Sequence, residues 1–107
     1  MEYEYTEDMD EISGFGGAYE AACRQMVLAG VKWLKEHPEA SPQFHGWKGV
    51  AGVIAEDNDD ANSLSKAIVE VVPDCSGAMY GSAVSHALYI HANGWDKYAA
   101  LMRDRKK

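Results

Sequence analysis

Apolar residues recur every three or four positions along most of this chain, which is the spacing of one face of an α-helix. The repeats predict helices over residues 17–36, 60–72, 77–92 and 95–104. A proline or an Asn-Gly pair follows the first three segments and marks where each helix must end. The pattern therefore predicts a mainly α fold, a small single-domain bundle of four to five helices.

Polar residues stand at the start of two of these helices. Asp59 or Asp60 can cap the helix over 60–72, and Ser76 can cap the helix over 77–92. The side-chain oxygens of Asp and Ser accept hydrogen bonds from the unpaired N–H groups of a first turn. We therefore expect Ser76 and one of the two aspartates to be N-cap residues.

Residues 47–56 fit two different elements. Their apolar positions match a helix, although Gly49 and Gly52 each cost a helix about 1 kcal/mol relative to alanine. The unbroken run 49–55 also matches a short buried strand, and the alternating segment 3–6 is the partner that we expect for it. We favour the helix and keep an α+β fold as the alternative. Residues 38–46 predict a connector with a short turn near its end.

The N-terminus differs from the rest of the chain. Its first twelve residues carry six acids, and like charges repel and extend a chain. We expect residues 1–12 to form an acidic tail, either a disordered solvated segment or one that becomes ordered on binding, and residues 13–107 to form the helical domain. A chain of 107 residues suits one domain with a radius of gyration of about 13 Å.

The net charge of −7 belongs to one end of the chain. Seven acids and no Lys or Arg occur among the first twenty residues, whereas the remainder has ten acids and ten bases. A second acidic group, here called the acidic cluster, comprises Glu56, Asp57, Asp59 and Asp60. Nucleic-acid-binding proteins usually carry a basic face, and the sequence shows none, so direct nucleic-acid binding is disfavoured. No apolar run is long enough to span a membrane. The acidic N-terminus predicts a cytoplasmic protein.

Metal and catalytic motifs are weak. A calcium loop starting at Asp57 would have Asn62 in place of glycine and Ile68 in place of glutamate. No histidine or cysteine spacing matches a zinc site, and two cysteines are too few for a disulfide framework. We expect no metal, no cofactor and no enzymatic activity. A small enzyme using Cys75, at a helix N-terminus, or a histidine is the third hypothesis.

Binding is the leading hypothesis. Carboxylates beside aromatic anchors suit an interface with a basic protein surface. In size and charge the chain is similar to small acidic inhibitors from phages and other mobile elements, including several anti-CRISPR proteins, which mimic nucleic acid. The partner-binding residues that we expect are Tyr3, Tyr5, Glu7, Asp8, Glu56, Asp57, Asp59 and Asp60.

A homo-oligomeric protein that binds or sequesters a small, nucleotide-like molecule is the alternative. Aromatic rings and histidines suit base stacking and phosphate contact. Because so short a chain has little room for a pocket, a subunit interface is where such a site would lie. The candidate ligand-binding residues are Phe44, His45, Trp47, Lys48, Tyr80, His86 and Tyr89.

Overall fold

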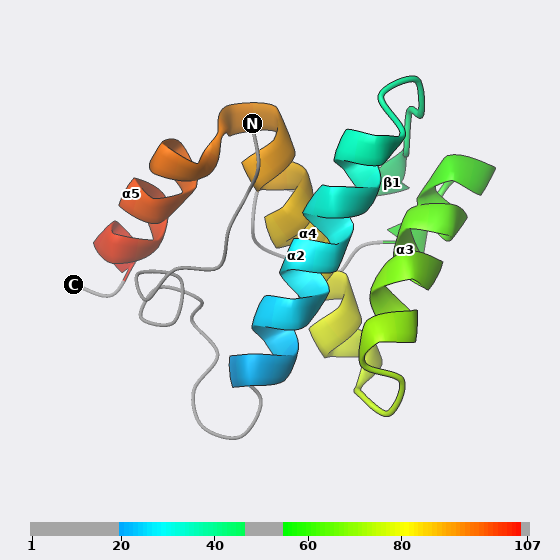
Figure 1. The fold of residues 1–107 in the computed structure, drawn as a ribbon, viewed down its shortest axis with the longest axis horizontal. Coiled ribbons are helices and arrows are strands. Elements are labelled where there is room, and N and C mark those ends of the chain that lie inside the picture. The colour runs from blue at the N-terminus through cyan, green and yellow to red at the C-terminus, as the bar shows by residue number, and fades with distance from the viewer. Residues whose placement is uncertain (1–19, 47–54, 106–107) are drawn as a thin grey trace.

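The structure is a computed structural model that describes residues 20–46 and 55–105 (Figure 1). The mainly α fold is confirmed, with a small two-stranded sheet added to it. Its elements, in order, are α2 (Glu20–Glu36), β1 (Phe44–His45), β2 (Ala55–Glu56), α3 (Asp59–Val71), α4 (Gly77–Asn93) and α5 (Trp95–Arg105).

The predicted signals account for both ends of α4. The hydroxyl oxygen of Ser76 accepts a hydrogen bond from the backbone N–H of Met79 at 3.2 Å, so Ser76 is the N-cap as predicted. At the other end Gly94 has a φ of 93°, and its N–H donates to the carbonyl of Ile90 at 2.8 Å. Glycine adopts this positive φ without the clash that a Cβ would cause, and α5 can therefore begin directly at Trp95.

The N-cap of α3 corrects the prediction. Asn58, and neither Asp59 nor Asp60, accepts the hydrogen bond from the first turn, through its Oδ1 atom and the N–H of Ala61. Asp59 and Asp60 lie inside the first turn, where their negative charge faces the positive end of the helix dipole.

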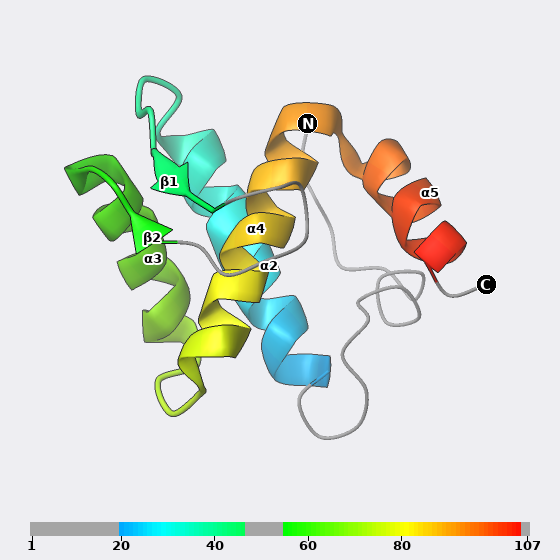
Figure 2. The ribbon, with the colours of Figure 1, turned by 180° about the vertical axis from the view of Figure 1, so that it is seen from behind.

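Helices α2 and α4 pack against each other and cross, with α3 on one flank and α5 on the other (Figures 1 and 2). A Cβ added to Gly30 in α2 would lie 2.7 Å from the Cβ of Ala87 in α4 and 2.9 Å from the Cδ1 of Ile68 in α3. The absence of a side chain at Gly30 therefore lets α2 approach both neighbours closely. The radius of gyration is 12.7 Å, close to the expected value.

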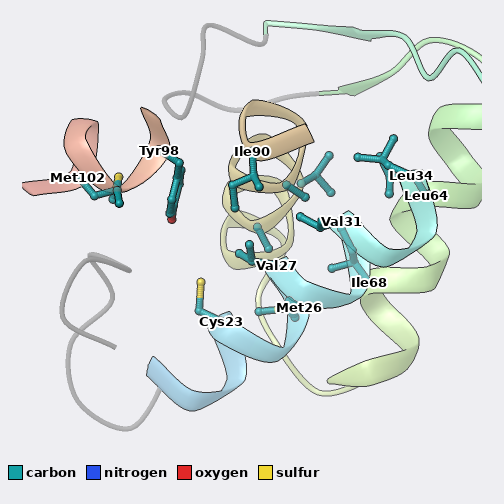
Figure 3. Close-up of a cluster of buried hydrophobic side chains, with 14 residues drawn as sticks. Cys23, Met26, Val27, Val31, Leu34, Leu64, Ile68, Ile90, Tyr98 and Met102 are labelled. Carbon is teal, nitrogen blue, oxygen red and sulfur yellow. The ribbon is translucent and has the colours of Figure 1, made fainter. Parts of the chain in front are cut away.

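The core lies where these helices meet (Figure 3). Its apolar residues come from all four described helices, and removing each large side chain from water contributes about 1.5–3 kcal/mol. They are Cys23, Met26, Val27, Val31, Leu34, Leu64, Ile68, Ala83, Val84, Ala87, Ile90, Tyr98, Ala99 and Met102. Among the described residues, the buried polar side chains are Ser85 and His86, both on α4.

The favoured helix over residues 47–56 was wrong at its C-terminal end, where the structure has a strand as in the α+β alternative. Ala55 and Glu56 form a strand and not the end of a helix, while residues 47–54 lie outside the described part. Within the described residues this strand pairs with β1, with Phe44 opposite Glu56 and His45 opposite Ala55 in antiparallel register, while the expected partner segment 3–6 lies outside the described part. Residues 44 and 45, which lie in the segment predicted as a short turn, thus form β1, the strand that pairs with β2.

The longest described helices, α2 and α4, have 17 residues each. No helix in the described part of the chain is long and apolar enough to cross a membrane.

Candidate functional site

Asn58 joins the start of α3 to the segment that leads into β1. Its Oδ1 atom accepts hydrogen bonds from the N–H of Ala61 at 2.9 Å and from the N–H of Gln43 at 3.1 Å. Its Nδ2 atom donates to the carbonyl of Ser41 at 2.8 Å. One side chain therefore caps a helix and satisfies two backbone groups of a distant segment.

Two members of the acidic cluster strengthen this junction. The Oδ2 atom of Asp60 accepts a hydrogen bond from the N–H of Ser41 at 2.9 Å, and the N–H of Asp57 donates to the carbonyl of Gln43 at 2.8 Å. Together with the bonds of Asn58, these contacts hold the acidic cluster in a defined position relative to β1.

The register of β1 and β2 brings two groups of candidate residues together. Phe44 and His45 were predicted as ligand-binding residues, and Glu56 and Asp57 as partner-binding residues, but all four lie at one end of the molecule. The Nδ1 atom of His45 is 2.5 Å from the Oδ1 atom of Asp57, and these side chains are 71% and 39% exposed. When His45 is protonated, this contact is an ion pair.

The remaining residues at this end differ in exposure. Glu56 and Asp59 are exposed, whereas the half-buried Phe44 packs against the core. The carboxylates of Glu56 and Asp59 therefore face solvent and are open to a partner, while Phe44 joins this part of the chain to the core.

The candidate residues on α4 lie elsewhere and make other contacts. The hydroxyl of Tyr80 is within hydrogen-bond distance of the carbonyls of Val72 and Pro73, and it accepts a bond from the N–H of Cys75 at 3.0 Å. Tyr80 thus satisfies backbone groups of the link between α3 and α4, which is a structural role.

His86 and Tyr89 contact α5. The Nδ1 atom of His86 lies 2.6 Å from the hydroxyl of Tyr98, and the rings of Tyr89 and Tyr98 are 6.3 Å apart. His86 is buried and Tyr89 half-buried. The predicted ligand-binding residues are therefore divided between the contact of α4 with α5, the α3–α4 link, and the sheet beside α3.

Six predicted site residues lie outside the described part of the chain: Tyr3, Tyr5, Glu7, Asp8, Trp47 and Lys48.

The sequence did not identify Asn58 and Tyr98 as residues of these contacts. Asn58 had a recognisable signal, because Asn is among the preferred N-cap residues and stands directly before the helix. Tyr98 had no such signal. Its place in the apolar repeat predicted burial, but nothing local indicates that its hydroxyl meets a histidine of another helix.

Both thiols are free. Cys23 is buried and Cys75 is half-buried. Burial, and secondarily the charge of Cys75, raises the pKa of Cys23 to about 12, while Arg24 acts in the opposite direction. Cys23 is therefore a protonated core residue at neutral pH. Over residues 20–46 and 55–105, no three His, Cys, Asp or Glu residues are grouped to hold a metal ion.

Comparisons of the chain with protein-family models, with curated proteins and with solved structures found no match. A function must therefore be argued from the chemistry of the residues themselves.

Proposed function

We propose that this protein is a non-enzymatic, acidic interaction protein that binds a basic surface of another protein through the end formed by β1, β2 and the start of α3. The observation that carries the proposal is the bonded position of the acidic cluster against residues 41–45. Carboxylates carried on a backbone fixed in this way lose less conformational freedom on binding than carboxylates on a flexible loop.

The negative charge of this end of the molecule supports binding to an electropositive partner. The described segments 39–46 and 55–60 contain five acids, which are Glu39 and the four residues of the acidic cluster, and no Lys or Arg. A surface of one sign attracts a partner of the opposite sign and raises the rate of encounter. His45 is the group here that can carry a positive charge, and it already faces Asp57.

The apolar character of the surface supports the same type of contact. Among the described residues, one large hydrophobic side chain is exposed, that of Val71, at 42%. Extended interfaces of obligate complexes are more hydrophobic than this. A charged interface, formed with a separately folded partner, therefore suits the described surface better.

The proposed mode of action is inhibition by occupation of a nucleic-acid-binding surface. Such surfaces carry Lys and Arg to neutralise phosphates, and fixed carboxylates can take the place of the phosphates. The acidic N-terminal residues, Tyr3 and Tyr5 included, are proposed to extend the contact.

The experiment uses two variants with the same change in net charge. Glu56→Gln with Asp59→Asn removes exposed charge from the acidic cluster without touching the bonds of Asp57, Asn58 or Asp60. Glu70→Gln with Asp96→Asn is the matched control, because both acids are exposed elsewhere, on α3 and α5. A third protein lacks residues 1–11.

Affinity is measured against a purified partner that the wild-type protein captures from host lysate, over a series of salt concentrations. The cluster variant is expected to bind more weakly and with a smaller salt dependence than the control, and duplex DNA or RNA should compete with the wild type. If the cluster variant, the truncated chain and the control all keep wild-type affinity and salt dependence, the proposal is wrong.

A further inference from the structure

His45 and Asp57 meet where β1 joins the acidic cluster, at the end of the molecule formed by the sheet and the start of α3 (Figure 2). The imidazole Nδ1 atom lies 2.5 Å from the Oδ1 atom of Asp57. Both residues are held by their backbones, since His45 pairs with Ala55 and the N–H of Asp57 donates to the carbonyl of Gln43. The fold therefore brings these two side chains together whether or not His45 is charged.

The contact also defines where His45 takes up a proton. A carboxylate is only an acceptor, so Nδ1 donates to Oδ1, and in the neutral imidazole Nε2 is the nitrogen without a proton. The side chain of His45 is 71% exposed, so water reaches it. A second proton can therefore bind at Nε2 without breaking the bond to Asp57, and the contact then becomes an ion pair.

The charged groups around this contact are acids. They come from β2, from α3, which packs against β2, and from the connector before β1. In segments 39–46 and 55–60 they are Glu39, Glu56, Asp57, Asp59 and Asp60, with no Lys or Arg. These segments therefore carry five negative charges and no positive one when His45 is neutral, and one positive charge against the same five when His45 is protonated.

The last turn of α2 adds balanced charge at the same end. Lys35 and Glu36 are both exposed and have opposite signs. His37 follows them, but its Nδ1 atom lies 2.8 Å from the carbonyl of Trp33, and its ring stacks on the Trp33 ring. His37 therefore contacts its own helix, whereas His45 contacts the acidic cluster.

We propose that His45 regulates the acidic interface through pH, because its proton neutralises Asp57 and puts a positive charge where the basic partner binds. The inference rests on the proposed function. Histidine ordinarily changes its charge between pH 5 and 8, whereas Asp and Glu ordinarily ionise below this range. Like charges that face each other across an interface oppose binding. The partner therefore binds more weakly as the pH falls and His45 takes up a proton, and more tightly as the pH rises and the proton is lost.

The test uses the full chain and one probe, an N-acetylated and C-amidated deca-arginine peptide, because arginine stays charged throughout this range. Affinity is measured at pH 5.5 and pH 8 in low salt. The wild type is expected to bind about two- to fivefold more weakly at pH 5.5, which is the effect of one surface charge pair. His45→Gln cannot gain the charge and should lose this pH dependence. His45→Lys carries the charge permanently and should bind at pH 8 as weakly as the wild type does at pH 5.5.

His91→Gln, at an exposed position of α4, is the matched control and should keep the wild-type pH dependence. Circular dichroism checks the fold of each variant at both pH values. Because the two His45 variants are expected to change binding in opposite directions, loss of structure cannot reproduce the result. The inference is overturned if His45→Gln keeps the pH dependence of the wild type, or if wild-type binding strengthens in acid.

Failure of the proposed function would give a different result. Glu56→Gln with Asp59→Asn would then bind the peptide as tightly as the wild type at pH 8. If this variant binds more weakly at pH 8 while His45→Gln and the wild type respond alike to pH, the acidic interface stands and the regulation by His45 is wrong.

Discussion

His86 in α4 and Tyr98 in α5 meet inside the protein, with 2.6 Å between the imidazole Nδ1 and the phenol oxygen. The two rings lie edge to face, with centroids 5.5 Å apart. Both residues are almost fully removed from water, at 3% and 1% exposure. This polar contact therefore positions α5 against α4 within an apolar surrounding.

Replacing Tyr98 with Phe should destabilise the fold, because the ring remains while the histidine loses its hydroxyl partner. The net contribution of one intramolecular hydrogen bond to stability is about 0.5–1.5 kcal/mol. We expect a fall of that size in the free energy of unfolding, measured by urea denaturation. Tyr89→Phe, on a half-buried tyrosine nearby, is the control and should stay within about 0.5 kcal/mol of wild type. Equal effects of the two variants would show that the Tyr98 hydroxyl adds nothing.

Asn58→Ala should weaken both α3 and its junction with residues 41–43. Loss of an N-cap alone costs about 0.5–2 kcal/mol, and the backbone groups of Ser41 and Gln43 lose their partner as well. Urea denaturation should therefore show a loss at or above the upper end of that range. Asn62→Ala, on an exposed position of α3, is the control.

Asn58→Asp separates the two roles of this side chain. It keeps an oxygen that can accept from Ala61 and Gln43 but removes the Nδ2 donor to Ser41. We expect its stability to lie between those of wild type and Asn58→Ala. A loss in Asn58→Ala no larger than in Asn62→Ala would contradict the role assigned to Asn58.

Gly30→Ala should destabilise the protein although alanine is the better helix former by about 1 kcal/mol. The new Cβ would lie 2.7 Å from that of Ala87, a short and rigid side chain that cannot move aside. Overpacking of a core costs about 1–3 kcal/mol, so α2 and α4 must separate. Thermal and urea unfolding should both show the loss.

A second substitution tests this explanation for Gly30. Ala87→Gly removes the group that alanine at position 30 would meet, so the double variant should recover part of the stability lost in Gly30→Ala. Residues in contact give such non-additive effects. Gly77→Ala is the control, because an added Cβ there meets nothing within 4 Å. Strict additivity of the pair would argue against the clash.

Alkaline pH should destabilise the fold through Cys23. Its pKa rises from 9.0 in a free chain to about 12 in the folded protein, so between these values the folded state holds a proton that the unfolded state has lost. Since stability falls with pH wherever the folded state binds more protons, the loss begins near pH 9. The free energy of unfolding of wild type should therefore decline more steeply above pH 9 than that of Cys23→Ala. Parallel declines would contradict the prediction.

The difference between the two thiols should also appear in their reaction rates. The thiolate is the reactive form of cysteine, and Cys23 is both buried and protonated, whereas Cys75 is half-exposed. Iodoacetamide should therefore modify Cys75 first in native protein, and Cys23 only after urea is added. Peptide mapping over time distinguishes them, and similar rates at both sites would be the contrary result.

The helices were predictable because their signals are local. The spacing of Leu64 and Ile68, the cap at Ser76 and the glycine at position 94 each act within a turn or two of chain, and α3, α4 and α5 begin and end close to the predicted positions. The choice of Asn58 over Asp59 as N-cap was also local, but three neighbouring residues could each fill that position. The structure separates them because, among the bonds of the described residues, the Asn58 side chain reaches Ser41 and Gln43 as well as the first turn, whereas Asp60 reaches Ser41 from inside that turn.

The sequence by itself determined the helical segments of this protein and the concentration of its negative charge, because periodicity, caps and composition do not depend on distant residues. Only the tertiary structure decided that Ala55 pairs with His45, that Asp57 lies beside His45, and that His86 meets Tyr98. Each of these contacts joins segments that the sequence separates. The first two form because α2 packs against α3 and so brings β1 beside β2, and the third forms because α5 packs against α4. No local pattern contains that information.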